Sequence, residues 1–245
     1  MCYNFYNMVN KNRSLVRARR ALQKYSNNKR ANVNKSFFKT GRGQYSEGDK
    51  FCGASVPDTR QVARQFCDLA LTDIKKLLNS AIHEERLLGL LILVEQFHGA
   101  DNTNSCRIYK FYLANLDGVN NWDLVDLSAY RIVGQYLSGR DKAILYKLAK
   151  SKNLWHRRIA IISTFTQIRQ NDFSNTLKLA NILMRDEHDL MHKAVGWMLR
   201  EVGKRSKSAL TRFLDKNNKA MPRTMLRYAI ERLTAKERKH YLSGY

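Results

Sequence analysis

Apolar residues recur at helical spacing along almost the whole chain after Asp58. The segments HEERLLGLLILVEQF, LWHRRIAIISTF and LMHKAVGWMLREVG each place large aliphatic residues every three or four positions, as amphipathic and buried helices do. No stretch alternates apolar and polar residues as a half-buried strand would. Only two prolines, Pro57 and Pro222, are present to interrupt helices. The pattern predicts an all-α protein.

The predicted long helices recur at a regular interval. Their first residues are separated by 39, 33 and 36 residues, and they are Ile82, Asn121, Leu154 and Leu190. Each interval holds a shorter apolar helix, at 105–116, 140–150 and 173–184. This period is typical of helix-pair repeats, which bury their apolar faces by stacking. We expect a curved solenoid whose long helices line a concave, basic face. An irregular helical bundle is the alternative, because the repeats share a pattern more than identity.

The N-terminal part departs from this pattern. Residues 1–25 are rich in arginine and contain no acid, which predicts a basic first helix, with an organelle transit peptide as the alternative. Residues 26–55 are polar and glycine-rich, so we expect a linker followed by an ordered loop. A phosphate-binding loop is disfavoured, because the Gly-Lys-Ser/Thr ending is missing. We therefore predict an N-terminal helix and linker over 1–35 and one helical-repeat domain over 36–245.

The net positive charge of the chain indicates what kind of partner it binds. The 245 residues include 44 basic and 21 acidic ones, a net charge of +23. Residues 1–50 hold twelve basic residues against two acidic ones, and residues 200–245 hold thirteen against four. Such self-repulsion is tolerated mainly when a polyanion is the intended neighbour. Nucleic acid is the predicted partner, contacted by both ends of the chain. An anionic membrane is disfavoured, because the charge is not confined to one amphipathic helix.

The cysteines and the lengths of the apolar runs indicate the cellular compartment in which the protein works. The four cysteines show no Cys-x-x-Cys pair, which favours free thiols in a reducing environment: Cys2, Cys52, Cys67 and Cys106. No apolar run is long enough to cross a bilayer, and the N-terminus lacks the apolar stretch of a secretory signal. We expect a cytoplasmic protein, associated with the nucleoid if the chain is bacterial.

A metal site is not predicted. His188 and His192 are spaced as two ligands on one helix face, but the glutamate of a His-Glu-x-x-His motif and a third ligand are missing. Capping or solvated roles are favoured for both histidines.

The stretch NNWDLVDLSAYRIVG, residues 120–134, places an acid on an apolar helix. One of its two asparagines can cap the helix, and Asp123 then lies in the first turn, where a carboxylate is favourable. Asp126 lies on the same face as Trp122, because the two are four residues apart. Acids on apolar faces often mark function, whereas a packed tryptophan and a solvated acid are the structural alternative.

Two later helices add residues of the same kind. One begins at LWHRRIAII with Arg157 and Arg158, and the next contains Trp197, Arg200, Glu201 and Lys204. Stacked repeats bring equivalent positions of successive helices together, so we expect these side chains to meet Trp122 and Asp126. Trp155 is interpreted as a core residue.

These residues resemble the AlkD-like DNA alkylation repair glycosylases, a family built from HEAT-like helical repeats. The resemblance lies in WDLVD at 122–126, in WHRRIAI at 155–161 and in KAVGWMLRE at 193–201. FFKTGRGQYSEGDKF followed by VPDTR is also similar to the N-terminal part of many members. The similarity extends from about Phe37 to Lys204. Arg42 departs from the family pattern, which has proline between the two glycines.

The resemblance implies roles for individual residues. Asp126 would be the catalytic carboxylate, Trp122 and Trp197 the aromatic walls against the lesion, and Arg158 a DNA contact beside them. Further contacts with the DNA backbone are expected from basic residues of the same helices: Arg157, Lys193, Arg200 and Lys204.

One carboxylate suits a cationic substrate. An N3- or N7-alkylated purine carries a positive charge, so the leaving base needs no general acid, and a single carboxylate can stabilise the sugar cation and orient water. We therefore expect a monomeric, monofunctional glycosylase that excises such purines, bulky adducts included, from duplex DNA for base excision repair without metal or organic cofactor. The alternatives are a non-catalytic binder of unusual DNA or RNA structures and a scaffold for acidic proteins.

Overall fold

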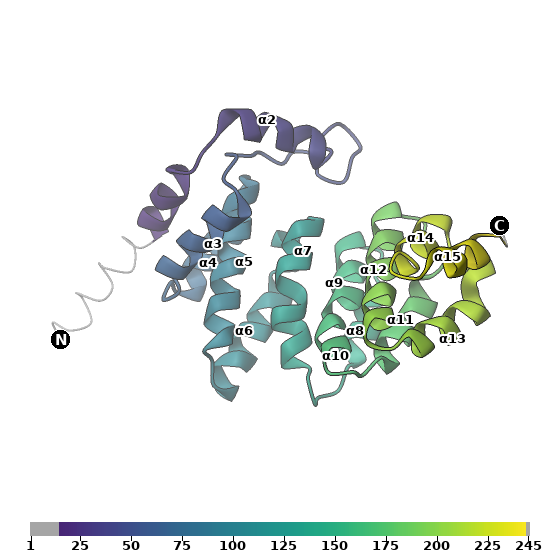
Figure 1. Ribbon diagram of the computed structural model, residues 1–245. Coiled ribbons are helices and arrows are strands. Elements are labelled where there is room, and N and C mark those ends of the chain that lie inside the picture. The colour runs from purple at the N-terminus through teal and green to yellow at the C-terminus, as the bar shows by residue number, and fades with distance from the viewer. Residues whose placement is uncertain (1–14, 244–245) are drawn as a thin grey trace. The chain divides into compact units, whose positions relative to one another are not determined.

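A computed structural model describes residues 15–243 of the chain (Figure 1). Every regular element in that range is a helix, and the only β-type pairing there is an isolated parallel bridge between Lys50 and Ile82. The all-α prediction is confirmed. Residues 1–14, with Cys2 and the start of the predicted basic helix, lie outside the described residues. The chain forms two compact units, Met1–Ser128 and Ala129–Tyr245, and the predicted division after residue 35 stays a prediction.

Helices of the first unit cover most of its length. A helical segment at residues 15–23 is followed by α2 (Asn28–Phe37), α3 (Val56–Gln65), α4 (Leu71–Leu78), α5 (His83–His98), α6 (Asn102–Ala114), the short 3-10 helix η1 (Leu116–Gly118) and α7 (Trp122–Ala129). Helix α5 packs against α3, α4 and α6 (Figure 1). It is apolar on all sides over residues 87–93, all of which are buried, as befits the central helix of a unit.

Helix α2 occupies residues for which the polar composition predicted a linker. The Asn27 side chain caps it by accepting a hydrogen bond from the backbone N–H of Arg30 at 2.9 Å, and Ala31 is the only buried residue within it. Residues 38–55 then form the expected ordered loop, in which Gly43, Gly48 and Gly53 have φ of 75°, 85° and 79°. Helix α2 carries no apolar stripe, so hydrophobic periodicity could not reveal it.

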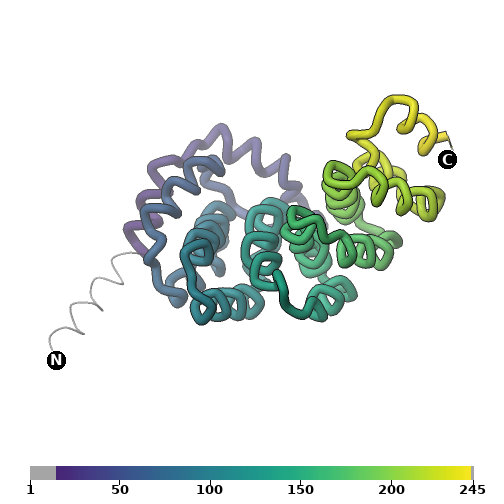
Figure 2. Tube along the Cα trace, turned by 60° about the horizontal axis from the view of Figure 1, so that its bottom comes forward, coloured from purple at the N-terminus to yellow at the C-terminus, as the bar shows by residue number. Residues whose placement is uncertain are grey.

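The second unit begins where α7 ends. Its elements are the π-helix η2 (Tyr130–Gly134), α8 (Ala143–Ala149), α9 (Leu154–Ser163), α10 (Phe165–Arg169), α11 (Ser174–Leu183), α12 (Asp189–Arg205), α13 (Lys207–Asn217), η3 (Asn218–Ala220), α14 (Arg223–Ala229) and α15 (Ala235–Leu242). Helix α12 packs against α9, α11, α13 and α14. The helices of this unit run from teal to yellow along the trace in Figure 2. At Gly196 a Cβ atom would lie 2.5 Å from the carbonyl oxygen of Met225, so only glycine lets α14 approach this closely.

The predicted repeat register is confirmed at the level of individual helices. Three of the four long helices begin at His83, Trp122 and Asp189, each one residue from the predicted start, and the fourth begins at Leu154 as predicted. The helices in the three intervals are α6, α8 and α11. Helices α6 and α8 are shorter than the long helix that precedes each of them, whereas α11 has 10 residues, as α9 does. Stacking of these pairs into a curved solenoid with a basic concave face stays a prediction. No helix in the described range is both long and apolar enough to cross a membrane.

Candidate active site

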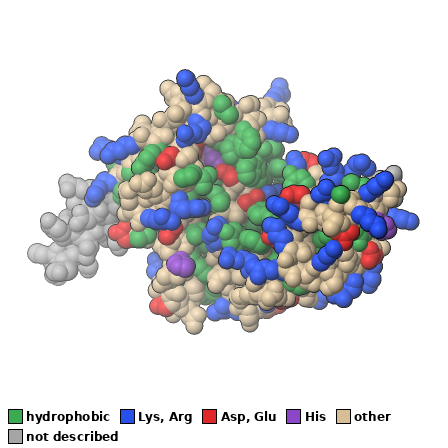
Figure 3. Space-filling view, in the orientation of Figure 1, with side chains coloured by type: hydrophobic (Ala, Val, Ile, Leu, Met, Phe, Trp, Pro, Cys, Tyr) green, Lys and Arg blue, Asp and Glu red, His purple; other side chains and the backbone are tan. Residues whose placement is uncertain are grey.

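A cavity of about 430 Å³ lies in the first unit. It is lined by side chains of α2, α5 and α7 and of the loop before α3, among them Phe37, Phe38, His83, Trp122, Asp126 and Leu127. In the space-filling view, hydrophobic and acidic side chains gather around a hollow next to α2 (Figure 3). An apolar cavity with a few polar groups is the usual form of a small-molecule or substrate site.

The first two turns of α7 bring two of the predicted residues into this cavity. Asn121 precedes the helix, and its Oδ1 accepts the backbone N–H of Trp122 at 2.8 Å. The other end of the same amide, Nδ2, donates to Ser46 Oγ at 2.5 Å, which ties α7 to the loop after α2. Trp122 and Asp126 are half-buried, and both line the cavity. The predicted shared face is therefore present, while the chemical roles of the two residues stay predictions.

Trp122 is part of an aromatic cluster that the sequence did not predict. Its indole stacks on the ring of Phe38, with centroids 5.2 Å apart and planes inclined by 20°. Phe37 meets it edge-on at 5.7 Å, and the Phe38 ring also stacks on Phe51 at 5.2 Å. Phe38 is buried, whereas Phe37 is 60% exposed. The indole is thus held against a packed ring, with a second ring at the surface beside it.

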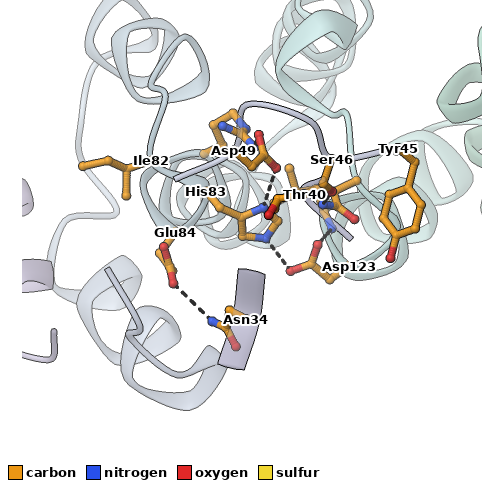
Figure 4. Close-up of polar contacts among 12 residues, drawn as sticks. Asn34, Thr40, Tyr45, Ser46, Asp49, Ile82, His83, Glu84 and Asp123 are labelled. Atoms are coloured by element: carbon orange, nitrogen blue, oxygen red, sulfur yellow. Dashed lines mark hydrogen bonds and ion pairs between the residues drawn. The ribbon is translucent and has the colours of Figure 1, made fainter. Parts of the chain in front are cut away.

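A buried ionic cluster borders the same cavity (Figure 4). His83 Nε2 lies 2.8 Å from Asp123 Oδ2, and His83 Nδ1 lies 3.4 Å from Asp49 Oδ2. Arg86 Nη2 donates to the other oxygen of Asp49 at 2.7 Å. The side chains of all four residues are at most 9% exposed, so their charges are shielded from water and rely on one another.

The cluster keeps His83 charged. Burial alone would lower the pKa of His83, but the negative charge and the hydrogen bond of Asp123, with the hydrogen bond to Asp49, raise it to about 9. Burial would raise the pKa of Asp49, but hydrogen bonds and charges of His83 and Arg86 outweigh it and lower that pKa below its usual value. At neutral pH the cluster therefore contains an imidazolium between two carboxylates.

Glu84 anchors the loop that carries the aromatic rings. Its carboxylate is buried and accepts the backbone N–H groups of Cys52 and Gly53, both at 2.9 Å, and the side-chain amide of Asn34 at 3.5 Å (Figure 4). Gly53 lies against the start of α2, where a Cβ atom would overlap the Asn27 carbonyl oxygen. Glu84 thus fastens both the loop and α2 to α5.

Tyr112 supports α7 from the side of α6. Its hydroxyl lies 2.9 Å from Ser128 Oγ, which in turn donates to the Leu124 carbonyl at 2.5 Å. Burial raises the pKa of Tyr112 and outweighs the hydrogen bond to Ser128, which lowers it, and the negative charge of Asp126 raises it further. This neutral phenol packs fully buried against the helix that carries Asp126.

The aromatic residue predicted in the second unit lies on α12. Trp197 is half-buried, and its Nε1 donates to Glu201 Oε1 at 3.1 Å. The same oxygen accepts Lys204 Nζ at 2.7 Å. The ring of Phe165 lies 5.9 Å from the indole. How these side chains meet the Asp126 cavity stays a prediction.

The remaining predicted DNA contacts each have a partner within the second unit. Arg157 pairs with Asp186, with Nε and Oδ2 2.5 Å apart. Arg158 is only 5% exposed, and its Nη1 donates to the Leu190 carbonyl at 2.5 Å. The last two ion pairs join Lys193 to Asp189 at 2.7 Å and Arg200 to Glu231. Arg158 in particular offers little surface to DNA in this arrangement.

Three of the cysteines and His188 match the roles expected from the sequence. Cys52, Cys67 and Cys106 are free thiols, as predicted. The His188 side chain caps α12 by accepting the backbone N–H of Leu190 at 3.1 Å, which confirms the favoured capping role. Within residues 15–243, no group of three or more His, Cys, Asp or Glu side chains is placed to hold a metal ion.

Comparison with known proteins places this geometry in context. A family model described as DNA alkylation repair enzyme matches residues 18–233. Among solved structures, a predicted DNA alkylation repair enzyme from Enterococcus faecalis is similar over 86% of this chain and 97% of its own, with a TM-score of 0.66 and 14% sequence identity. At that identity the likeness shows a shared fold alone. No curated protein matches the chain.

Proposed function

Because the chain belongs to the DNA alkylation repair enzyme family, we propose that it hydrolyses the N-glycosidic bond of cationic N3- or N7-alkylated purines in duplex DNA. The family match over residues 18–233 confirms the resemblance that the tryptophan and aspartate motifs indicated. The observation that carries the proposal is that Asp126 and Trp122, both half-buried, line the same largely apolar cavity.

The charges around the cavity favour Asp126 as the reacting group. Three carboxylates line the cavity, and two of them, Asp123 and Glu84, are at most 6% exposed. Asp126 is the more exposed of the three. Its apolar surroundings strengthen the attraction between its carboxylate and a developing positive charge.

The proposed reaction needs few participants. As the bond between the sugar and the cationic base breaks, positive charge moves onto the sugar, and the bonding electrons leave with the base, which becomes neutral. Asp126 stabilises the sugar cation and orients a water molecule, whose oxygen bonds to the sugar carbon while its proton passes to the carboxylate or to solvent. The face of Trp122 attracts the cationic substrate. The products are a free base and an abasic site.

The excess of basic residues supports duplex DNA as the substrate. The chain carries a net charge of +23, and phosphate contacts of lysine and arginine dominate affinity for DNA in most such proteins. In the proposed complex, Arg157, Arg158, Lys193, Arg200 and Lys204 contact the DNA and Trp197 forms a second aromatic wall. Those contacts require the internal ion pairs of the second unit to loosen or to be shared with phosphates.

The proposal is tested with a duplex that contains one 7-methylguanine. Purified protein is expected to release free 7-methylguanine and leave an alkali-labile abasic site, and to release nothing from the same duplex with guanine. If the protein binds every cationic purine tried, including N3-alkylated adenine, but releases none of them, the proposed activity is wrong and the protein is a non-catalytic binder. Binding to unusual DNA or RNA structures would then be measured instead.

A further inference from the structure

The cluster around His83 borders the cavity but has no part in the reaction proposed above. Burying two carboxylates, an imidazolium and a guanidinium is unfavourable unless each charge is well paired, and well-packed apolar residues would stabilise such a site equally well. The cluster joins three separate segments: α5 through His83, the loop after α2 through Asp49, and α7 through Asp123. The backbone N–H of His83 also donates to the Lys50 carbonyl at 2.8 Å.

Both residues proposed to act on the substrate depend on these contacts. Asp123 lies in the first turn of α7, between Trp122 and Asp126, so its bond to His83 fixes the start of the helix from which both side chains project. The imidazole ring also contacts Phe38 at 4.8 Å. The ring of Phe38 in turn stacks on Trp122. The histidine is therefore connected to the indole along two routes, one through the helix and one through the rings.

We propose that His83, by bridging Asp49 and Asp123, is a positioning residue that fixes the Asp126 carboxylate and the Trp122 indole for base release. The inference rests on the proposed function. Charge-assisted hydrogen bonds are directional and short, and a misplacement of about 1 Å in a reacting group lowers a rate about a hundredfold. Loss of the bridge lowers the rate of base release and leaves the phosphate contacts intact.

The bridge that His83 forms between Asp49 and Asp123 weakens as the pH rises. The charged groups that face the ring are Asp123 from α7, Asp49 from the loop, and Arg86 from α5 itself, while Phe38 and Phe51 add only ring faces. The imidazolium persists through neutral pH and loses its proton near pH 9. Above that pH, Asp123 loses its cationic partner, so the rate of base release falls.

The test measures single-turnover release of 7-methylguanine from pH 6.5 to 10 with saturating protein, for the wild type, His83→Gln and His98→Gln. His98 is exposed at the end of the same helix and serves as the matched control. A protein-free sample corrects for base lost or ring-opened by alkali. Affinity for undamaged duplex and circular dichroism are recorded at each pH.

We expect the wild-type rate to fall above about pH 9, and the control to follow it. His83→Gln, which keeps a donor but not the charge, is expected to release base about tenfold more slowly at pH 7. Its rate is expected to show no further fall above pH 9, with affinity for undamaged DNA within about twofold of the wild type.

Two results would overturn the inference while leaving the proposed function in place. One is a wild-type rate that stays level from pH 8.5 to 10 in folded protein, a measurement that needs no variant. The other is a His83→Gln profile that matches the wild type in rate and shape. A wild type that releases no base at any pH would instead remove the proposed function, and the positioning role with it.

Discussion

The two units hold their charged side chains in different ways. In the first unit, acids and a histidine are buried around a cavity, and the bonds of the histidine join segments far apart in the chain, as His83 joins Asp49 and Asp123. In the second unit, most of the cations predicted to contact DNA lie at least partly exposed and pair with acids, as Arg200 does with Glu231.

We therefore expect the buried cluster to affect the chemical step and the exposed cations to affect DNA binding. Buried ion pairs are strong constraints on geometry, because breaking one leaves an uncompensated charge. Exposed ion pairs contribute little to stability and can be exchanged for phosphates. Changes to the buried ionic cluster of the first unit should therefore alter folding and rate, and changes to the exposed cations of the second unit should alter affinity and its dependence on salt.

Gly53→Ala is expected to have a large effect on stability. The residue has φ of 79°, and a Cβ atom would overlap the Asn27 carbonyl oxygen and lie 2.8 Å from the Ala31 nitrogen. We expect a loss of about 3 kcal/mol in the free energy of unfolding, measured by urea denaturation. Gly99→Ala is the control, because Gly99 has φ of −96° and open space around it. Equal stability of both variants would show that α2 is not fastened at Gly53.

The stability of the wild type should depend on His83 at alkaline pH. Below pH 6.5 the imidazole holds its proton in both the folded and the unfolded chain, so its contribution is complete. As pH rises through about 9, the folded protein loses the proton as well, and the contribution vanishes. We expect a decline on the order of 3 kcal/mol in the free energy of unfolding across this window. In His83→Gln the decline should be much smaller, and equal slopes in the two proteins would contradict the ionic cluster.

The two tryptophans test whether one site draws on both units. Trp122→Ala removes the indole that lines the cavity, so we expect about a tenfold lower single-turnover rate with little change in affinity for undamaged DNA. Trp197→Ala is expected to act in the same direction. A loss of affinity without a loss of rate in Trp197→Ala would make that residue a binding residue alone, and the same result in Trp122→Ala would remove the cavity from the chemistry.

The smallest effects are expected for single cations of the second unit. Arg200→Ala and Lys204→Ala should each lower the slope of log affinity against log salt concentration by about one if the side chain contacts a phosphate. Lys178 on α11 is the control, since the predicted array places the shorter helices away from DNA. An unchanged slope in Arg200→Ala would mean that its ion pair with Glu231 persists in the complex.

The sequence predicted the long helices and the shared face of Trp122 and Asp126, because both follow from spacing within one helix. It could not predict α2, which lacks an apolar stripe. The aromatic and ionic neighbours of Trp122 were also invisible, since Phe38 and His83 are brought to α7 by tertiary packing across many residues. Asp123 shows this limit of sequence analysis. Its position in the first turn of a helix was a sufficient reason for a carboxylate there, but the structure shows that it also binds His83.

The pairing of cations in the second unit escaped prediction for a related reason. Arg157 meets Asp186, 29 residues later, and Arg200 meets Glu231, 31 residues later. These separations are close to the predicted repeat period, so the partners lie about one repeat further along the chain. A periodic pattern predicts which helices recur, but it does not show which exposed side chains of neighbouring helices pair.

Asp126 is the proposed catalytic carboxylate, so the most direct measurement is the single-turnover rate of 7-methylguanine release by Asp126→Asn under saturating protein. Asp117→Asn, an exposed acid just before α7, is the matched control. We predict that Asp126→Asn binds the damaged duplex as tightly as the wild type and releases base about a hundredfold more slowly or worse, while Asp117→Asn is unchanged. A release rate in Asp126→Asn within about twofold of the wild type would contradict the account.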